Sequence, residues 1–268
     1  MSTIYKPFDI SIRKSQNDLF TEIVGLKRDN AFITKVLNRY SDYLQQLCMA
    51  HEKANQTLSL SYSDSLARLQ KAAAYKDDDT GVHVSRIAHL SQLVAKSSGM
   101  SDEFCKLIYQ ASPMHDIGKI GIPDSILKKQ GPLNDSEWEV MREHPNYGGD
   151  ILSQSYDPMM EMAREIALCH HEKWDGSGYP SKLQADQIPM SARIVAIVDV
   201  FDALTMNRCY RPALPDSVAL SIIKDGRGKH FCPFITDTFL AISDEIIQLR
   251  NTINDEQHLF YHFNHLVK

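Results

Sequence analysis

Apolar residues recur at helical spacing along most of this chain. In the segment 63–76, Leu66, Leu69 and Ala73 follow one another at intervals of three and four residues, which places them on one face of a helix. The same periodicity predicts further helices over 82–100, 101–119, 133–154, 158–171, 191–206, 215–230 and 237–253. None of these segments alternates apolar and polar residues as a half-buried strand does. The pattern therefore predicts an all-α fold, a helical bundle with an N-terminal helical extension.

Local signals refine the ends of these helices. Ser101, with Glu103 close behind it, is a typical helix start. The pair His144-Pro145 interrupts the helix predicted over 133–154, because a proline disfavours helical backbone in the residue before it. Glycine and proline predict loops over 118–134, 174–189 and 209–215.

The region before about residue 63 has a different periodicity. Seven positions fit the a and d spacing of a heptad repeat: Leu37, Tyr40, Leu44, Leu47, His51, Ala54 and Leu58. The repeat lapses at Ser61 and Ser65. Three heptads with a histidine at one a position favour a coiled coil and an ordinary packed amphipathic helix about equally.

Composition excludes several functional classes. The net charge of −5 and the pI near 6.1 argue against binding of a nucleic acid polymer, which requires a basic surface. The five cysteines are scattered and lack CxxC spacing, so we expect reduced thiols in a cytoplasmic protein. No apolar run is long enough to span a bilayer, and the N-terminal residues lack a signal-peptide pattern.

A ladder of histidines and aspartates is the strongest chemical signal. Its seven members are His83, His115, Asp116, His144, His170, His171 and Asp199. Imidazole and carboxylate groups suit iron, manganese, zinc or nickel. One structural zinc needs about four ligands, commonly with thiolates among them. Seven donors without a cysteine instead match two ions that share a carboxylate, a geometry suited to cleavage of phosphate esters.

The motifs around this ladder resemble a known family. HDIGK at 115–119, HHEKWDGSGYP at 170–180 and DVFDALTMNRCYR at 199–211 are similar to the HD-GYP domain of the HD superfamily of metal phosphohydrolases. The resemblance runs from about Lys71 to about Leu240. It implies a catalytic HD-GYP domain over 64–268 and an N-terminal helical segment over 1–63, which would serve as a linker or dimerisation helix.

The resemblance also implies an activity. Members of this family hydrolyse cyclic dinucleotides, chiefly cyclic di-GMP, to linear pGpG and in some cases to GMP. The metals are usually iron or manganese. On this chain, one ion would be held by His83, His115, Asp116 and Asp199, and the other by Asp116, His144, His170 and His171. Asp116 would bridge the two ions, because each of its oxygens can bind one, and hydroxide between them would be the nucleophile.

Several residues match family positions that contact the substrate. Lys119 lies four residues after His115, so a helix would place it on the metal-facing side as a cation for a phosphate oxygen. Asp202, Arg208 and Arg211 are the other matches. An arginine fork suits a phosphate or the Hoogsteen edge of guanine.

The Gly178-Tyr179-Pro180 loop leaves directly from the paired histidines and should shape the substrate entrance. Tyr179 could stack on the substrate, or the loop could contact a diguanylate cyclase (GGDEF) domain. The family usually has glycines near Lys182 and Ala185, and an acidic residue in place of Cys232. Their absence here leaves the conformation of the loop open.

A third ion is expected to be absent or weakly held. Some relatives have a glutamate four residues before the first histidine of the ladder, whereas this chain has Asp79. An aspartate is one methylene shorter, and metal–oxygen distances tolerate only about 0.2 Å of deviation. Asp79 could also orient an imidazole or a bound water instead.

The leading hypothesis is therefore a cyclic di-GMP phosphodiesterase with two divalent metals. Two alternatives remain open from the sequence. The chain could be a catalytically silent signalling module that binds nucleotide or a cyclase, or a phosphodiesterase that prefers 3′,3′-cyclic GMP-AMP. All seven donors are present, which favours activity.

Overall fold

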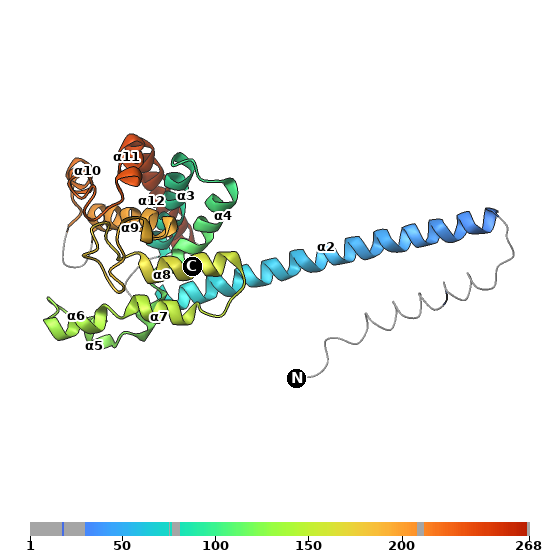
Figure 1. The fold of residues 1–268 in the computed structure, drawn as a ribbon, viewed down its shortest axis with the longest axis horizontal. Coiled ribbons are helices and arrows are strands. Elements are labelled where there is room, and N and C mark those ends of the chain that lie inside the picture. The colour runs from blue at the N-terminus through green and yellow to red at the C-terminus, as the bar shows by residue number, and fades with distance from the viewer. Residues whose placement is uncertain (1–17, 19–29, 75, 77–80, 208–211, 267–268) are drawn as a thin grey trace. The chain divides into compact units, whose positions relative to one another are not determined.

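The computed structural model describes Asp18, residues 30–74, Lys76 and the ranges 81–207 and 212–266. The chain divides into two compact units, Met1–Leu66 and Ala67–Lys268. Most of the described residues are helical and none lies in a strand (Figure 1); an isolated bridge joins Arg227 and Phe231. The predicted all-α fold is confirmed. None of the described helices has an apolar stretch long enough to cross a membrane.

The first unit is dominated by helix α2 (Asn30–Ala74), which continues past the end of the unit. The heptad positions Leu37, Tyr40, Leu44 and Leu47 all lie exposed on this helix. Leu58 is exposed as well, to 70 %. An apolar stripe along the described part of α2 is therefore left uncovered by the described residues.

The second unit is a bundle around α3 (Gly81–Ser97) and α9 (Met190–Thr205). Helix α3 packs against α4 (Asp102–Ala111), α9 and α12 (Ser243–Leu266). Helix α8 (Pro158–Cys169) packs against α4, α9 and α7 (His144–Ile151) (Figure 1). Helix α9 buries residues on nearly all of its faces, as expected for a central helix. Phe201 of α9 meets Phe239 edge to face in this core.

The remaining helices complete the unit. They are α5 (Asp124–Leu127), α6 (Asp135–Met141), α10 (Asp216–Asp225) and α11 (Pro233–Ala241), with 3-10 turns η1 (Ser112–Met114), η2 (Ile117–Gly121) and η3 (Ala185–Gln187). Asn134 caps α6 and forms a capping box with Glu137. Helix α7 begins at His144 with proline in its first turn, so the predicted interruption is confirmed.

Two helix predictions and one loop prediction need correction. The helix expected over 101–119 begins after its Ser101 cap but ends at Ala111, because Pro113 has no N–H to continue the hydrogen bonding. The segment 237–253 is divided between α11 and α12, and Asp244 and Glu245 provide the acidic first turn of α12. The loop expected over 118–134 contains the short helix α5.

Candidate metal centre

All seven residues of the predicted ladder come together in the second unit. They form two groups, one of Asp116, His144, His170 and His171 and the other of His83, His115 and Asp199. Within each group, one donor atom from each residue lies within 4.8 Å of the others. The residues come from α3, the turn between η1 and η2, the start of α7, the end of α8 and the middle of α9.

Asp116 lies between the two groups. Its Oδ1 is 3.2 Å from His144 Nε2 and 3.5 Å from His170 Nε2. Its Oδ2 is 3.2 Å from His115 Nε2, on the side of the second group. The two oxygens of one carboxylate thus face different sets of imidazoles, which is the arrangement that a bridging ligand requires.

Four imidazoles are held through Nδ1. Three of these contacts reach backbone carbonyls: His115 to Ser112 O at 3.1 Å, His144 to Met141 O at 2.8 Å and His170 to Ile166 O at 3.0 Å. The fourth joins His83 to the Asp202 carboxylate at 2.8 Å. A carbonyl or carboxylate oxygen accepts, so Nδ1 of each imidazole carries a proton and Nε2 is the nitrogen left to face the centre. This is the orientation of an imidazole that binds a metal through Nε2.

The atoms that face the centre lack hydrogen-bond partners. They are Nε2 of His115, His144 and His170, and Oδ1 of Asp116, all buried. Their close approaches to one another do not have hydrogen-bond geometry. A buried polar atom left unpaired costs about 1–3 kcal/mol, so four in one place require an explanation. Cations bound at the two groups would satisfy all four, and the donor set therefore fits metal ions.

The pKa values of residues in the two groups also indicate a site for a cation. Burial disfavours a charged imidazole, but Asp116 and Asp199 outweigh it and raise the pKa of His115 to about 9. Burial also opposes ionisation of Asp116, yet Lys119 and His115 hold the pKa of that carboxyl well below its usual range. Burial and the neighbouring imidazoles hold the pKa of His171 well below normal. The carboxylates thus attract positive charge, while His171 stays neutral as a metal ligand must.

Asp202 occupies a different place from the one expected of a substrate contact. Its side chain is 2 % exposed, and both of its oxygens are occupied. Oδ2 is bonded to His83 and, at 2.8 Å, to Nη2 of Arg86, while Oδ1 accepts from Arg86 Nε. Despite burial, Arg86 and His83 lower the pKa of Asp202 to about 2. This placement favours a role in orienting His83.

Arg86 was not anticipated from the sequence. It lies one helical turn after His83 on α3, is buried, and also donates to Asn254 at 3.0 Å. A buried arginine needs a carboxylate partner. The spacing of three residues, which places Arg86 on the same face of a helix as His83, was the sequence signal that could have identified it.

Lys119 lies beside the centre, although not by the expected route. The segment is a 3-10 turn, and Lys119 Nζ lies 2.8 Å from Asp116 Oδ2 at a spacing of three residues. The prediction that an α-helix places Lys119 on the same face as His115 was therefore wrong, because Pro113 ends the preceding helix. Lys119 still places a cation next to the predicted bridging carboxylate.

The Gly-Tyr-Pro loop folds back onto the paired histidines. The Tyr179 ring stacks on His171 with centroids 4.8 Å apart, and Tyr179 N donates to His171 O. Gly178 is required by close approach, because a Cβ there would lie 2.4 Å from the backbone nitrogen of Lys173. The loop is therefore part of the wall of the centre.

Glu172 fastens this loop and was also missed. It directly follows the paired histidines and is 2 % exposed. Its carboxylate accepts backbone N–H bonds from Ser181 at 2.7 Å and Leu183 at 3.0 Å. Burial raises the pKa of Glu172, against the effect of these bonds. Its position within the HHE sequence was the signal that could have identified it.

The loop adopts glycine-like backbone without glycine. Lys182 and Ala185, where the family usually has glycines, have φ of 55° and 50°. For an L-residue this conformation costs roughly 1–2 kcal/mol. The surrounding bonds, including Ala185 N to Trp174 O at 2.9 Å, hold it in place. Cys232, in the position of the family's acidic residue, is buried at the start of α11.

Three predicted residues lie outside the described part of the chain. They are Arg208 and Arg211, expected to contact the substrate, and Asp79, considered for a third ion. Their roles stay predictions.

Comparison with known proteins identifies the class. Residues 55–235 match the HD domain family. This match covers more than half of the chain, which therefore belongs to the HD domain family. Its motifs and relatives place it among HD-GYP domains, as the sequence predicted.

Two curated relatives are informative. A 3′3′-cGAMP-specific phosphodiesterase 2 of Vibrio cholerae is 40 % identical over 215 residues, covering 80 % of this chain and 41 % of that protein. A cyclic di-GMP phosphodiesterase of Thermotoga maritima is 39 % identical over 243 residues, covering 88 % and 66 %. The chain thus spans less than two thirds of either relative.

A solved structure supports the fold alone. A cyclic GMP-AMP specific phosphodiesterase from Vibrio cholerae superimposes with a TM-score of 0.53 at 17 % identity, covering 71 % of this chain and 52 % of the other.

Proposed function

We propose that this chain is a metal-dependent phosphodiesterase that hydrolyses cyclic di-GMP to linear pGpG and onward to GMP. The observation that carries the proposal is the set of four buried, unpaired donor atoms around Asp116. The names of the curated relatives support cyclic dinucleotides as the substrate class.

Two divalent ions, iron or manganese, are the cofactors that we propose. His83, His115, Asp116 and Asp199 would hold one, and Asp116, His144, His170 and His171 the other. When bound, such ions lower the pKa of water and neutralise charge on a phosphate. Histidine-rich donors disfavour magnesium, which prefers oxygen ligands and retains water. A third ion is not part of the proposal.

The protein's own groups complete the site. Lys119 places its ammonium beside Asp116, where it can also neutralise a phosphate oxygen. Asp202 and Arg86 hold the His83 ring in one orientation. Tyr179 covers His171 and excludes water from that side. Each group reduces the reorganisation that the reaction requires.

We expect the purified protein, reconstituted anaerobically, to cleave cyclic di-GMP faster with iron or manganese than with magnesium. Chromatography of the products should show pGpG first and GMP later. Parallel reactions with 3′,3′-cyclic GMP-AMP test the alternative substrate suggested by the Vibrio relative. Binding of either dinucleotide without cleavage under all metal conditions would instead identify a silent signalling module.

In that silent alternative, a diguanylate cyclase would contact the chain through Gly178-Tyr179-Pro180. Gly178 is buried and Tyr179 packs against His171, so this segment offers a small surface to a partner. The geometry therefore favours a role for the loop within the site.

We also propose that α2 forms a homodimer through its heptad stripe. With Leu37 at an a position, the charged residues of 33–58 all fall at b, c or f: Lys35, Arg39, Asp42, Glu52 and Lys53. The a, d, e and g positions are free of charge, so two copies can meet in register without repulsion. This stripe is also exposed in the described structure.

Light scattering should therefore give about twice the chain mass of 30.4 kDa. Replacing Leu44 and Leu47 by glutamate should give monomers, because charge is then buried in the seam. Met49→Glu is the matched control, since Met49 is 62 % exposed but occupies an f position. A monomeric wild-type chain, or an equal loss of dimer in the control, would contradict the proposal.

A further inference from the structure

Arg142 lies in an aromatic setting next to the centre. It follows the last residue of α6, two residues before His144. Its guanidinium carbon lies 5.6 Å from the centroid of the Tyr179 ring and 6.0 Å from that of Trp138. Distances of up to about 6 Å are typical of cation–π contacts. Tyr179 in turn stacks on His171, so this arginine extends the wall of the site outward.

The guanidinium is held in place but keeps its donors available. Trp138 precedes Arg142 by one helical turn, whereas Tyr179 comes from the Gly-Tyr-Pro loop, so two distant segments position it. Arg142 is exposed, and within the described part of the chain no carboxylate lies at ion-pair distance from it. Trp138 is itself 45 % exposed, which is unusual for so large an apolar ring.

We infer that Arg142 recognises a guanine base of the substrate through O6 and N7, with Trp138 and Tyr179 holding its guanidinium plane. Guanine presents two acceptors on this edge, which match two arginine donors, whereas adenine presents one donor and one acceptor. An aromatic setting suits a flat base beside the guanidinium better than a tetrahedral phosphate. Arg142 would thus determine specificity, and it takes no part in bond cleavage. The inference rests on the proposed cyclic dinucleotide substrate.

Direct binding tests it without requiring turnover. We expect calorimetry on the metal-loaded full chain, with a non-hydrolysable phosphorothioate analogue of cyclic di-GMP as the ligand, to show binding about 10- to 100-fold weaker to Arg142→Ala, a range typical of one bidentate base contact. Cyclic di-AMP should bind equally to both proteins. Arg142→Lys keeps the charge but loses the fork, so it should behave like Arg142→Ala. In turnover, KM for cyclic di-GMP should rise and kcat should change less than about threefold.

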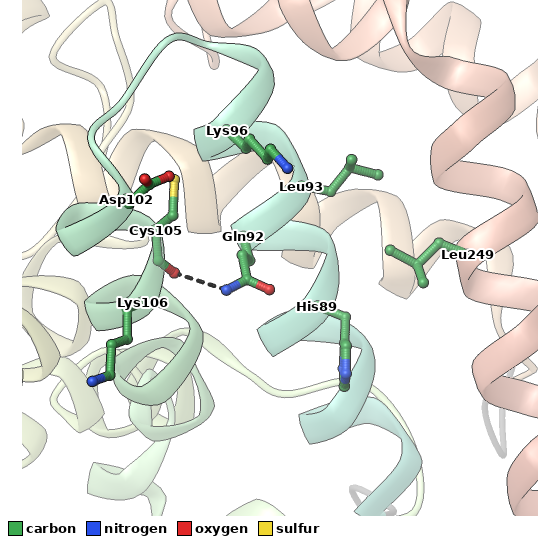
Figure 2. Close-up of a pocket in the computed structure, with 8 residues that line it drawn as sticks. All are labelled: His89, Gln92, Leu93, Lys96, Asp102, Cys105, Lys106 and Leu249. Atoms are coloured by element: carbon green, nitrogen blue, oxygen red, sulfur yellow. Dashed lines mark hydrogen bonds between the residues drawn. The ribbon is translucent and has the colours of Figure 1, made fainter.

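Lys106→Ala is the matched control. Lys106 is another exposed cation, on α4, and lines a separate cavity of about 430 Å³ between α3, α4 and α12 (Figure 2). This change should leave both affinities unaltered.

Two outcomes would overturn the inference. Unchanged binding of cyclic di-GMP to Arg142→Ala would show that the base does not reach this residue. Full rescue by Arg142→Lys, or an equal loss for cyclic di-AMP, would show a phosphate contact instead. Hydrolysis of bis(p-nitrophenyl) phosphate, which has no base, reports on the metal centre separately. Its absence in the wild-type chain would count against the proposed function and would leave the binding result valid.

Discussion

Replacing both His115 and Asp116 by alanine is expected to lower hydrolysis of cyclic di-GMP by at least about 1,000-fold, as removal of central catalytic groups does in other enzymes. These residues contribute to both groups of donors, and Asp116 has one oxygen facing each group. Most of the bound metal should be lost with them. Activity assays and elemental analysis of the purified variant measure the two effects.

Circular dichroism should show that this variant stays helical, because the helices around the centre are held by an apolar core. His89→Ala is the matched control, since His89 is a half-buried histidine on α3 outside the two groups. It should retain both metal and activity. Full activity in the double variant would disprove the two-metal proposal.

A substitution of Gly118 should have the largest effect on stability. Helix α7 crosses η2 so closely that a Cβ on Gly118 would lie 1.9 Å from His144 O and 2.4 Å from Gly148 N. Both are backbone atoms, so the segments must separate. We expect Gly118→Ala to lower the free energy of unfolding by about 3 kcal/mol or more. Metal content should fall as well, because His144 would be displaced.

Gly81→Ala provides the control for this prediction. Gly81 begins α3, and among the described residues nothing beyond its own helix lies within 4 Å of an added Cβ, so alanine should be neutral or stabilise by up to about 1 kcal/mol. Urea unfolding followed by circular dichroism compares the two variants. If Gly118→Ala were as stable as Gly81→Ala, the close approach of α7 to Gly118 of η2 would be contradicted.

Helix prediction succeeded where one apolar face decides the structure and failed where backbone chemistry or tertiary contacts do. Helices α3 and α8 follow their apolar periodicity closely. Pro113 ends a helix whose apolar pattern continues beyond it, and Lys119 therefore reaches Asp116 through a 3-10 turn. Ala185 has positive φ without glycine, because bonds from distant residues maintain it.

The donor residues illustrate the same division. His115-Asp116 and His170-His171 stand out in the sequence because adjacent polar residues at helix ends have little reason to be buried unless they bind something. Their division into two groups around Asp116 depends on how α3, α7, α8 and α9 pack. Periodicity along one helix contains no information on that packing.

The sequence by itself determined the all-α class, the HD-GYP family and the seven candidate donors, because these depend on local periodicity and on residue type. Only the tertiary structure decided how those donors are oriented. Arg86 and Asp202 fix His83, Glu172 anchors the loop, and Arg142 lies beside Tyr179. Each of these contacts joins residues from separate segments or fastens a loop through its backbone. Such contacts arise only when folding brings the segments together, since side-chain hydrogen bonds and cation–π contacts act over a few ångströms.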